Sequence, residues 1–319
     1  MARTDSKLRQ RSYSANAPEI ATVHSYHSGS GSSNYAYNGF FDNRYYTSDR
    51  FIKLDNNFRR PDGKALKGYG LEIELGCNTI SSTTVLAEIL DKVVFSHFPD
   101  HLFKMQSDCS LRGSSTAECI TQVMTREFIR NHYPEFKLMY DHYFRTLGIE
   151  SNTSCGMHCN ISNAVFGASE KTQADAIRKL YYIVNHHYDQ MCIMLHRDRD
   201  ATRYCGRMTA EKEACRTMDL TGHISSHGVS FNLGHYTEGR IELRLVGNQI
   251  SYACFRNTME TIFHLCSAVK DLSWSDCDDF ARIWYGCNQH VFDRLTMVRG
   301  MDAADLQRVR NTVVPVDFR

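Results

Sequence analysis

The stretch GYGLEIELGC, residues 68–77, decides the fold prediction. Leucine and isoleucine occupy every second position and alternate with Glu72 and Glu74. A period of two predicts a strand whose alternate side chains share a face. The apolar side chains would pack against a core, and both carboxylates would lie together on the opposite face.

Three other segments repeat this alternation. The predicted polar faces carry His158, Asn160 and Ser162 in GMHCNIS, Arg240, Glu242 and Arg244 in GRIELRL, and Glu118 in TAECIT, where Ile120 falls on the same side. A single antiparallel sheet with one face in water would explain any one of these strands. The alternative is that the polar faces form a site.

The composition of the four polar faces favours a site. Three carry carboxylates, one adds a histidine and one adds two arginines. Carboxylates two residues apart on a strand repel each other unless a cation lies between them. Mg²⁺ and Mn²⁺ prefer oxygen ligands, and Mn²⁺ also accepts imidazole. We therefore predict a divalent metal site, and the arginines predict an anionic ligand such as a polyphosphate.

Composition excludes some classes of partner. The chain has 319 residues, of which 42% are hydrophobic, and a formal charge of +1. Such a balance gives no global field for nucleic acid or an anionic membrane. Without an apolar run of roughly 18 residues or a signal peptide, we expect a cytoplasmic protein with no membrane or nucleic-acid partner. The twelve cysteines contain no Cys-x-x-Cys pair, so we expect mostly reduced, buried thiols, with a structural zinc site as the alternative.

The order of predicted elements indicates an α+β fold. Residues 1–64 are rich in Ser, Asn and Tyr and predict a flexible arm, whose aromatic side chains could dock on a partner or on a second copy of the chain in a homo-oligomer. Residues 65–319 predict one α+β domain with a largely antiparallel sheet. The predicted helices cover about 82–98, 127–147, 171–195, 252–272 and 276–292, and Pro134 should start or bend the second of them.

The ordered motifs resemble the amidoligase family, ATP-dependent carboxylate-amine ligases of the glutamine synthetase superfamily. That family shows a Gly-x-Glu-x-Glu strand, an Asp-x-Ser-Leu segment before a Glu-bearing strand, a Cys-Gly-x-His strand, an Asn-Leu strand and a Glu-x-Arg strand. This chain supplies, in the same order, GLEIEL, SDCSLRGSSTAEC, SCGMHCNIS, SFNLGH and IELRL. The resemblance covers roughly residues 67–272. It implies that residues 65–319 form a glutamine synthetase-like catalytic domain, with a curved, mainly antiparallel sheet and helices packed on one face.

The resemblance also implies residue roles. The metal ligands for two or three Mg²⁺ or Mn²⁺ ions would be Glu72, Glu74, Glu118, His158 and Glu242. Arg244 would hold a substrate carboxylate or a phosphate, and Asp108 is the candidate base that deprotonates the incoming ammonium. ATP would be contacted by Asn160, which stands where the family commonly has a second histidine, and one or two of Arg199, Arg203, Arg207 and Arg240 would stabilise charge on its γ-phosphoryl group.

The implied reaction joins a carboxylate and an amine. ATP would convert the carboxylate of an amino acid, peptide or protein to an acyl phosphate, which the amine would displace to give an amide or isopeptide bond. Two alternatives stay open. The first is a glutamate-cysteine ligase-like or other phosphoryl-transfer enzyme of the same fold, and the second is a non-catalytic member that binds nucleotide or protein.

Overall fold

The chain forms two compact units and crosses between them several times. In the computed structural model the described residues are 43–48, 50–106, 111–150, 154–198, 205–221, 228–247, 249 and 251–314, with two short strands at 22–23 and 34–35. The first unit comprises residues 1–64, 70–157 and 250–252, and the second comprises 65–69, 158–249 and 253–319. Most of the predicted arm lies outside the described residues, and the predicted division at residue 64 stays a prediction.

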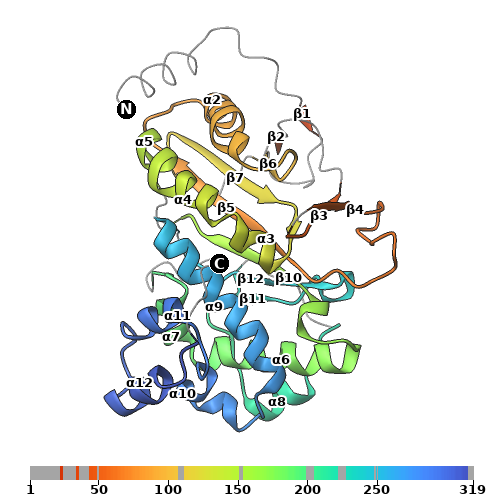
Figure 1. The fold of residues 1–319 in the computed structure, drawn as a ribbon, viewed down its shortest axis with the longest axis vertical. Coiled ribbons are helices and arrows are strands. Elements are labelled where there is room, and N and C mark those ends of the chain that lie inside the picture. The colour runs from red at the N-terminus through yellow and green to blue at the C-terminus, as the bar shows by residue number, and fades with distance from the viewer. Residues whose placement is uncertain are drawn as a thin grey trace. The chain divides into compact units, whose positions relative to one another are not determined.

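Strands of the first unit form a mainly antiparallel sheet (Figure 1). Its strands are β3 (Arg44–Tyr46), β4 (Phe51–Lys53), β5 (Tyr69–Cys77), β6 (Phe103–Gln106), β7 (Ser115–Thr121), β8 (Val123–Met124) and β9 (Ile149–Glu150). β7 pairs antiparallel with both β6 and β5, and β9 also pairs with β5. β3 pairs antiparallel with β4 and parallel with β8. β1 (Thr22–Val23) and β2 (Asn34–Tyr35) form a separate two-stranded sheet.

Helices of the first unit are short and irregular. α2 (Thr83–Ile89) begins where the Ser82 hydroxyl accepts a hydrogen bond from the Val85 amide, continues as η1 (Leu90–Val94) and η2 (Phe95–His97), and lies against β7. The helix predicted over 127–147 is divided into α3 (Arg126–Asn131), α4 (Tyr133–Leu138), η3 (Met139–Phe144) and α5 (Arg145–Leu147). The break precedes Pro134, which lacks an amide hydrogen and therefore opens a new helix.

Antiparallel pairing joins three strands of the second unit. β12 (Arg240–Leu243) pairs with β10 (Met157–Ser162) on one side and with β11 (Phe231–Asn232) on the other. Two hydrogen bonds connect the end of β10 to the chain before β5: the Ser162 amide donates to the Gly68 carbonyl at 3.0 Å, and the Gly68 amide donates to the Ser162 hydroxyl at 2.7 Å. All three strands are shorter than the alternating segments predicted.

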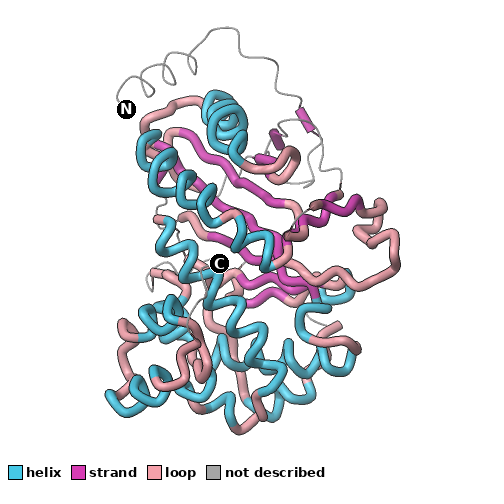
Figure 2. Tube along the Cα trace, viewed as in Figure 1, coloured by secondary structure: helices cyan, strands magenta, loops and turns pink. Residues whose placement is uncertain are grey.

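Helices make up most of the second unit (Figure 2). The longest are α6, which a Ser169–Thr172 capping box starts, and α9. The predicted helix 171–195 divides near His187. The helical segments are η4 (Asn163–Phe166), α6 (Glu170–His186), α7 (Tyr188–Met194), α8 (Lys212–Thr217), η6 (Tyr236–Glu238), α9 (Tyr252–Asp271), η7 (Asp276–Asp278), α10 (Phe280–Ile283), α11 (Gln289–Leu295) and α12 (Ala303–Arg310).

One helix prediction is wrong. Residues 276–292 do not form a continuous helix but η7, α10 and the beginning of α11. Asp279 caps α10 by accepting from two amides, and Asn288 caps α11 by accepting from Val291. Gly286, with φ +75°, turns the chain between them. Two caps and a glycine in the left-handed region therefore interrupt an apolar period that alone predicts one helix.

The coarse fold prediction is confirmed: both units mix helices with mainly antiparallel strands. The glutamine synthetase-like identity of the fold stays a prediction. The cysteines of the described residues are free thiols, and all but Cys254 are buried. None of the helices in the described part of the chain has the length and apolarity needed to cross a membrane.

Candidate functional site

Three carboxylates share one face of the sheet in the first unit. Glu74 on β5 is directly opposite Glu118 on β7, and Glu72 is opposite Ile120. Residues directly opposite one another in an antiparallel pair lie on the same face, as do residues two apart on one strand. Glu72, Glu74 and Glu118 therefore occupy one face, as the alternating sequence predicts.

Burial distinguishes this face from a solvated one. Glu74 is only 8% exposed, and Glu72 and Glu118 are partly buried. The side chains that alternate with them, including Leu71, Ile73 and Cys119, are buried. Two partly buried carboxylates that are directly opposite each other on neighbouring strands repel each other. This repulsion destabilises the folded protein unless a positive charge compensates it.

Lys104 supplies one positive charge to this face. It lies on β6 opposite Ile120, which is itself opposite Glu72 on β5. Burial lowers the pKa of Lys104, and the charges of Glu118 and Glu72 oppose that decrease. Sequence reasoning missed this residue, although the alternation of LFKMQ already placed Lys104 away from the apolar face of its strand.

Glu242 is the centre of a buried polar cluster in the second unit. Its Oε2 accepts a hydrogen bond from Asn232 Nδ2 at 2.8 Å, and its Oε1 accepts one from Arg244 Nη1 at 2.5 Å. His158 Nδ1 lies 3.4 Å from the same Oε1. Glu242 is 4% exposed, and His158, Asn232 and Arg244 are also buried. Contacts within the protein thus fix three neighbours of one carboxylate. Asn232 was not predicted individually, although its motif was.

Asn160 and Arg240 contact each other beside this cluster. Asn160 is opposite Glu242 in the register of β10 and β12, and its Oδ1 accepts a hydrogen bond from Arg240 Nη1. A second terminal nitrogen of Arg240 lies 3.5 Å from the exposed carboxylate of Glu238. Both residues are only partly buried, so both retain polar atoms near solvent.

The remaining predicted residues are placed elsewhere or lie outside the described part. Arg207 donates to the Asn185 carbonyl at 3.0 Å and to the His186 carbonyl at 3.5 Å, so it binds the C-terminal end of α6. Cations at that position stabilise a helix through its unpaired carbonyls. Asp108, Arg199 and Arg203 lie outside the described residues.

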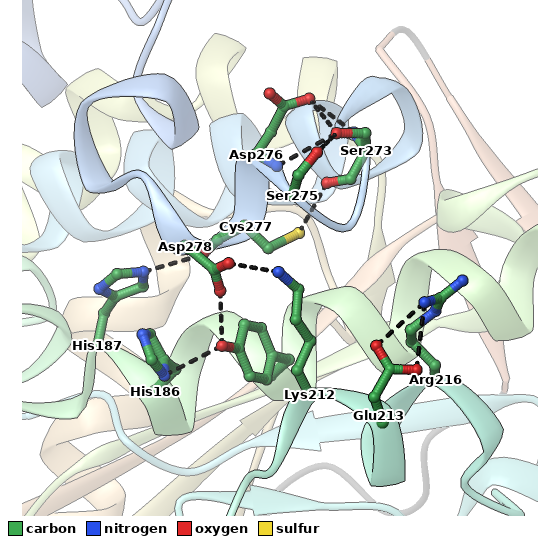
Figure 3. A network of polar contacts seen from close by, with 11 residues as sticks. His186, His187, Lys212, Glu213, Arg216, Ser273, Ser275, Asp276, Cys277 and Asp278 are labelled. Carbon is green, nitrogen blue, oxygen red and sulfur yellow. Dashed lines mark hydrogen bonds and ion pairs between the residues drawn. The ribbon is translucent and has the colours of Figure 1, made fainter.

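A separate polar network joins α6 to η7 and α8 (Figure 3). The Tyr182 hydroxyl donates to Asp278 at 2.7 Å and lies 3.1 Å from His186 Nδ1, while Lys212 pairs with the other oxygen of Asp278. His187 is buried and bonds the Cys277 carbonyl at 2.9 Å through Nε2. These contacts give both histidines a packing role.

Each unit thus holds its own set of polar groups. The first holds three carboxylates and a lysine on a sheet face, and the second holds a carboxylate, an imidazole and arginines in one cluster. Carboxylate and imidazole are suitable ligands for Mg²⁺ and Mn²⁺. No family model matches the chain, and no curated protein matches it significantly.

Proposed function

We propose that the chain is an ATP- and Mg²⁺- or Mn²⁺-dependent carboxylate-amine ligase of the amidoligase type. The observation that carries the proposal is the shared face of Glu72, Glu74 and Glu118, with Glu74 and Glu118 directly opposite. Three carboxylates at this spacing are costly in a purely structural sheet and useful in one that binds cations. Their residue types and order also match the motifs of the resemblance.

The proposed metal ligands are the carboxylates Glu72, Glu74 and Glu118 of the first unit, and Glu242 and the imidazole of His158 in the second. Carboxylate oxygens suit both cations, whereas an imidazole nitrogen fits Mg²⁺ poorly and Mn²⁺ well. When bound, the cations would neutralise the phosphates of ATP. Asn232 and Arg244 fix the orientation of Glu242 in either case.

The proposed reaction has two balanced steps. A carboxylate oxygen attacks the γ-phosphorus of ATP, the bond to ADP breaks, and an acyl phosphate forms. The amine nitrogen then attacks the acyl carbon, the bond to phosphate breaks, and a base takes the proton released. Arg244 would hold the substrate carboxylate or a phosphoryl oxygen, and Asn160 with Arg240 would contact the nucleotide.

One observation favours the non-catalytic alternative. Asn160 and Arg240, which the proposal assigns to the nucleotide, bond each other. Catalysis therefore requires that this hydrogen bond be exchanged for contacts to ATP, whereas a protein-binding member could retain it.

Trapping the acyl phosphate tests the proposal. Hydroxylamine converts acyl phosphates to hydroxamates, so a screen of amino acids and peptides with ATP, Mn²⁺ and hydroxylamine should yield hydroxamate and ADP in equal amounts for one carboxylate class. Glu118→Gln should reduce the yield at least about a hundredfold, since removing a charged ligand weakens binding of the cations that the reaction needs. Glu127→Gln, a change at an exposed carboxylate of α3, is the matched control. A screen without hydroxamate, or a Glu118→Gln variant as active as the control, would reject the ligase.

A further inference from the structure

Arg197 is a buried cation that the proposed function does not use. It lies directly after α7 and is 8% exposed. Its Nη2 donates to the main-chain carbonyl of Arg244 at 3.0 Å. Among the described residues no carboxylate pairs with Arg197, and its Nε has no hydrogen-bond partner there.

A buried guanidinium in this state requires an explanation. Arginine keeps its proton at any pH a protein experiences, so burial cannot be relieved by neutralisation as it can for lysine. Leaving a buried charge without a counter-ion is costly, and leaving a buried donor unpaired adds to that cost. A main-chain carbonyl satisfies one donor of the fork and supplies no negative charge.

Arg244 has a related deficiency. It is 9% exposed, and its Nη1 binds Glu242 while its Nε has no partner among the described residues. Both arginines are more than nine-tenths buried, and one carbonyl joins them. Each has an unsatisfied donor, so the pair has an excess of hydrogen-bond donors and of positive charge. An oxyanion is the ligand that satisfies both.

The main chain around the pair is held tightly. The Gly247 amide donates to the Leu195 carbonyl at 2.9 Å, and the Arg197 amide donates to the Cys192 carbonyl at 2.8 Å. A Cβ on Gly247 would lie 2.0 Å from the His196 carbonyl oxygen. The segment 195–197 therefore packs directly on the segment 244–247, and this packing fixes the main chain of Arg197 relative to that of Arg244.

We propose that Arg197 and Arg244 form one oxyanion-binding subsite, in which Arg197 positions the main chain of Arg244 and contributes the second guanidinium. The inference rests on the proposed function in that Arg244 holds an anion there, and it adds Arg197, to which the sequence assigned no role. The ligand is a carboxylate or a phosphoryl group of a substrate, since both present oxygens to a guanidinium fork.

Calorimetry on the full chain with EDTA and without ATP tests the subsite. The probes are inorganic phosphate and glutarate, and the probe that wild type binds more tightly identifies the source of the oxyanion. Arg197→Gln should weaken that binding about ten- to a hundredfold, the range expected for one charge-assisted contact. Arg294→Gln is the matched control, because Arg294 also donates to a carbonyl near the end of α7, that of Ile193, at 2.7 Å. The control should keep the affinity of wild type.

A second readout separates binding from a structural role. If the role of Arg197 is to bind a ligand, the Arg197→Met variant should unfold, in the absence of ligand, at the temperature of wild type or at a higher one. The reason is that the substitution removes an uncompensated buried charge. Wild-type affinity in the Gln variant, no binding of either probe by wild type, or a lower unfolding temperature with unchanged affinity would overturn the inference.

If the Gln variant does not fold, Arg197→Lys, which keeps the charge and loses the fork, should bind about tenfold more weakly, and equal affinity would overturn it. Because the assay contains no metal or ATP, loss of the ligase activity alone would reject the proposed function and leave this subsite standing.

Discussion

Glu74 and Glu118 are directly opposite each other on neighbouring antiparallel strands, and both side chains point to the same face of the sheet. Like charges in this relationship are destabilising by a few tenths of a kcal/mol to about 1 kcal/mol. The sheet tolerates this repulsion next to a buried apolar face, which is the pattern expected where binding function opposes stability.

The first prediction concerns this pair. Glu118→Gln should leave the free energy of unfolding unchanged or raise it by about 0.5 kcal/mol in the presence of EDTA, because the repulsion disappears. In millimolar Mn²⁺ the order should reverse, since only wild type gains the stabilisation that a bound cation provides. Thermal unfolding of both proteins with and without Mn²⁺ measures this. An Mn²⁺-dependent increase of the same size in the variant would show that Glu118 is not a ligand.

The second prediction concerns Lys104. Its ammonium lies beside the carboxylates Glu72 and Glu118 and competes electrostatically with a cation bound there. Lys104→Met should therefore tighten Mn²⁺ binding about fivefold, corresponding to roughly 1 kcal/mol for a partly buried charge. Calorimetric titration with Mn²⁺ is the measurement, and Lys92→Met, which removes an ammonium paired with Glu88 on α2, is the control. Equal tightening in both variants would indicate a general charge effect instead of a local one.

The sequence predicted the parts of the site that depend on strand periodicity. Period two alone places Glu72 with Glu74 and His158 with Asn160, because alternate residues of a strand share a face. The pairing of Glu74 with Glu118 could not be predicted, since register depends on the turn between strands and on packing. Lys104 was missed for that reason: its position opposite Ile120 becomes significant only when β6, β7 and β5 are aligned.

Contacts made by long side chains could not be predicted. Arg207, assigned to ATP by resemblance, binds carbonyls at the end of α6, and the sequence offered no reason to assign a role to Arg197. An arginine can reach acceptors in several directions from one main-chain position, so spacing along the sequence does not define its partner. The helix predicted over 276–292 failed for a local reason, because Asp279 and Asn288 are strong caps within an apolar pattern.

The third prediction concerns pH. Burial, with a smaller contribution from Arg294, lowers the pKa of His196 from 6.5 to about 4. The imidazole therefore binds a proton near pH 6.5 in the unfolded chain but only near pH 4 in the folded chain. The free energy of unfolding should decrease as pH falls across this window. His196→Asn, which suits the left-handed φ of +57° at this position, should remove about 3 kcal/mol of that decrease. Urea unfolding of both proteins at pH 4 and pH 7.5 gives the comparison. Parallel pH profiles would contradict the assignment.

The last prediction concerns Gly247. An added Cβ would meet three main-chain atoms of His196 and Arg197 within 2.5 Å, and main chain cannot move aside as a flexible side chain can. Gly247→Ala should therefore lower the free energy of unfolding by about 3 kcal/mol, at the upper end of overpacking effects. Because the displaced segment carries Arg197, the phosphate or glutarate affinity of the folded fraction should also fall. Gly300→Ala is the control: its φ of +105° strains an alanine, but nothing lies within 4 Å of the new Cβ, so it should cost only about 1 kcal/mol and leave anion binding unchanged. Denaturant unfolding and calorimetry on the two variants measure both effects, and a Gly247→Ala protein as stable as wild type would contradict the close packing of segments 195–197 and 244–247.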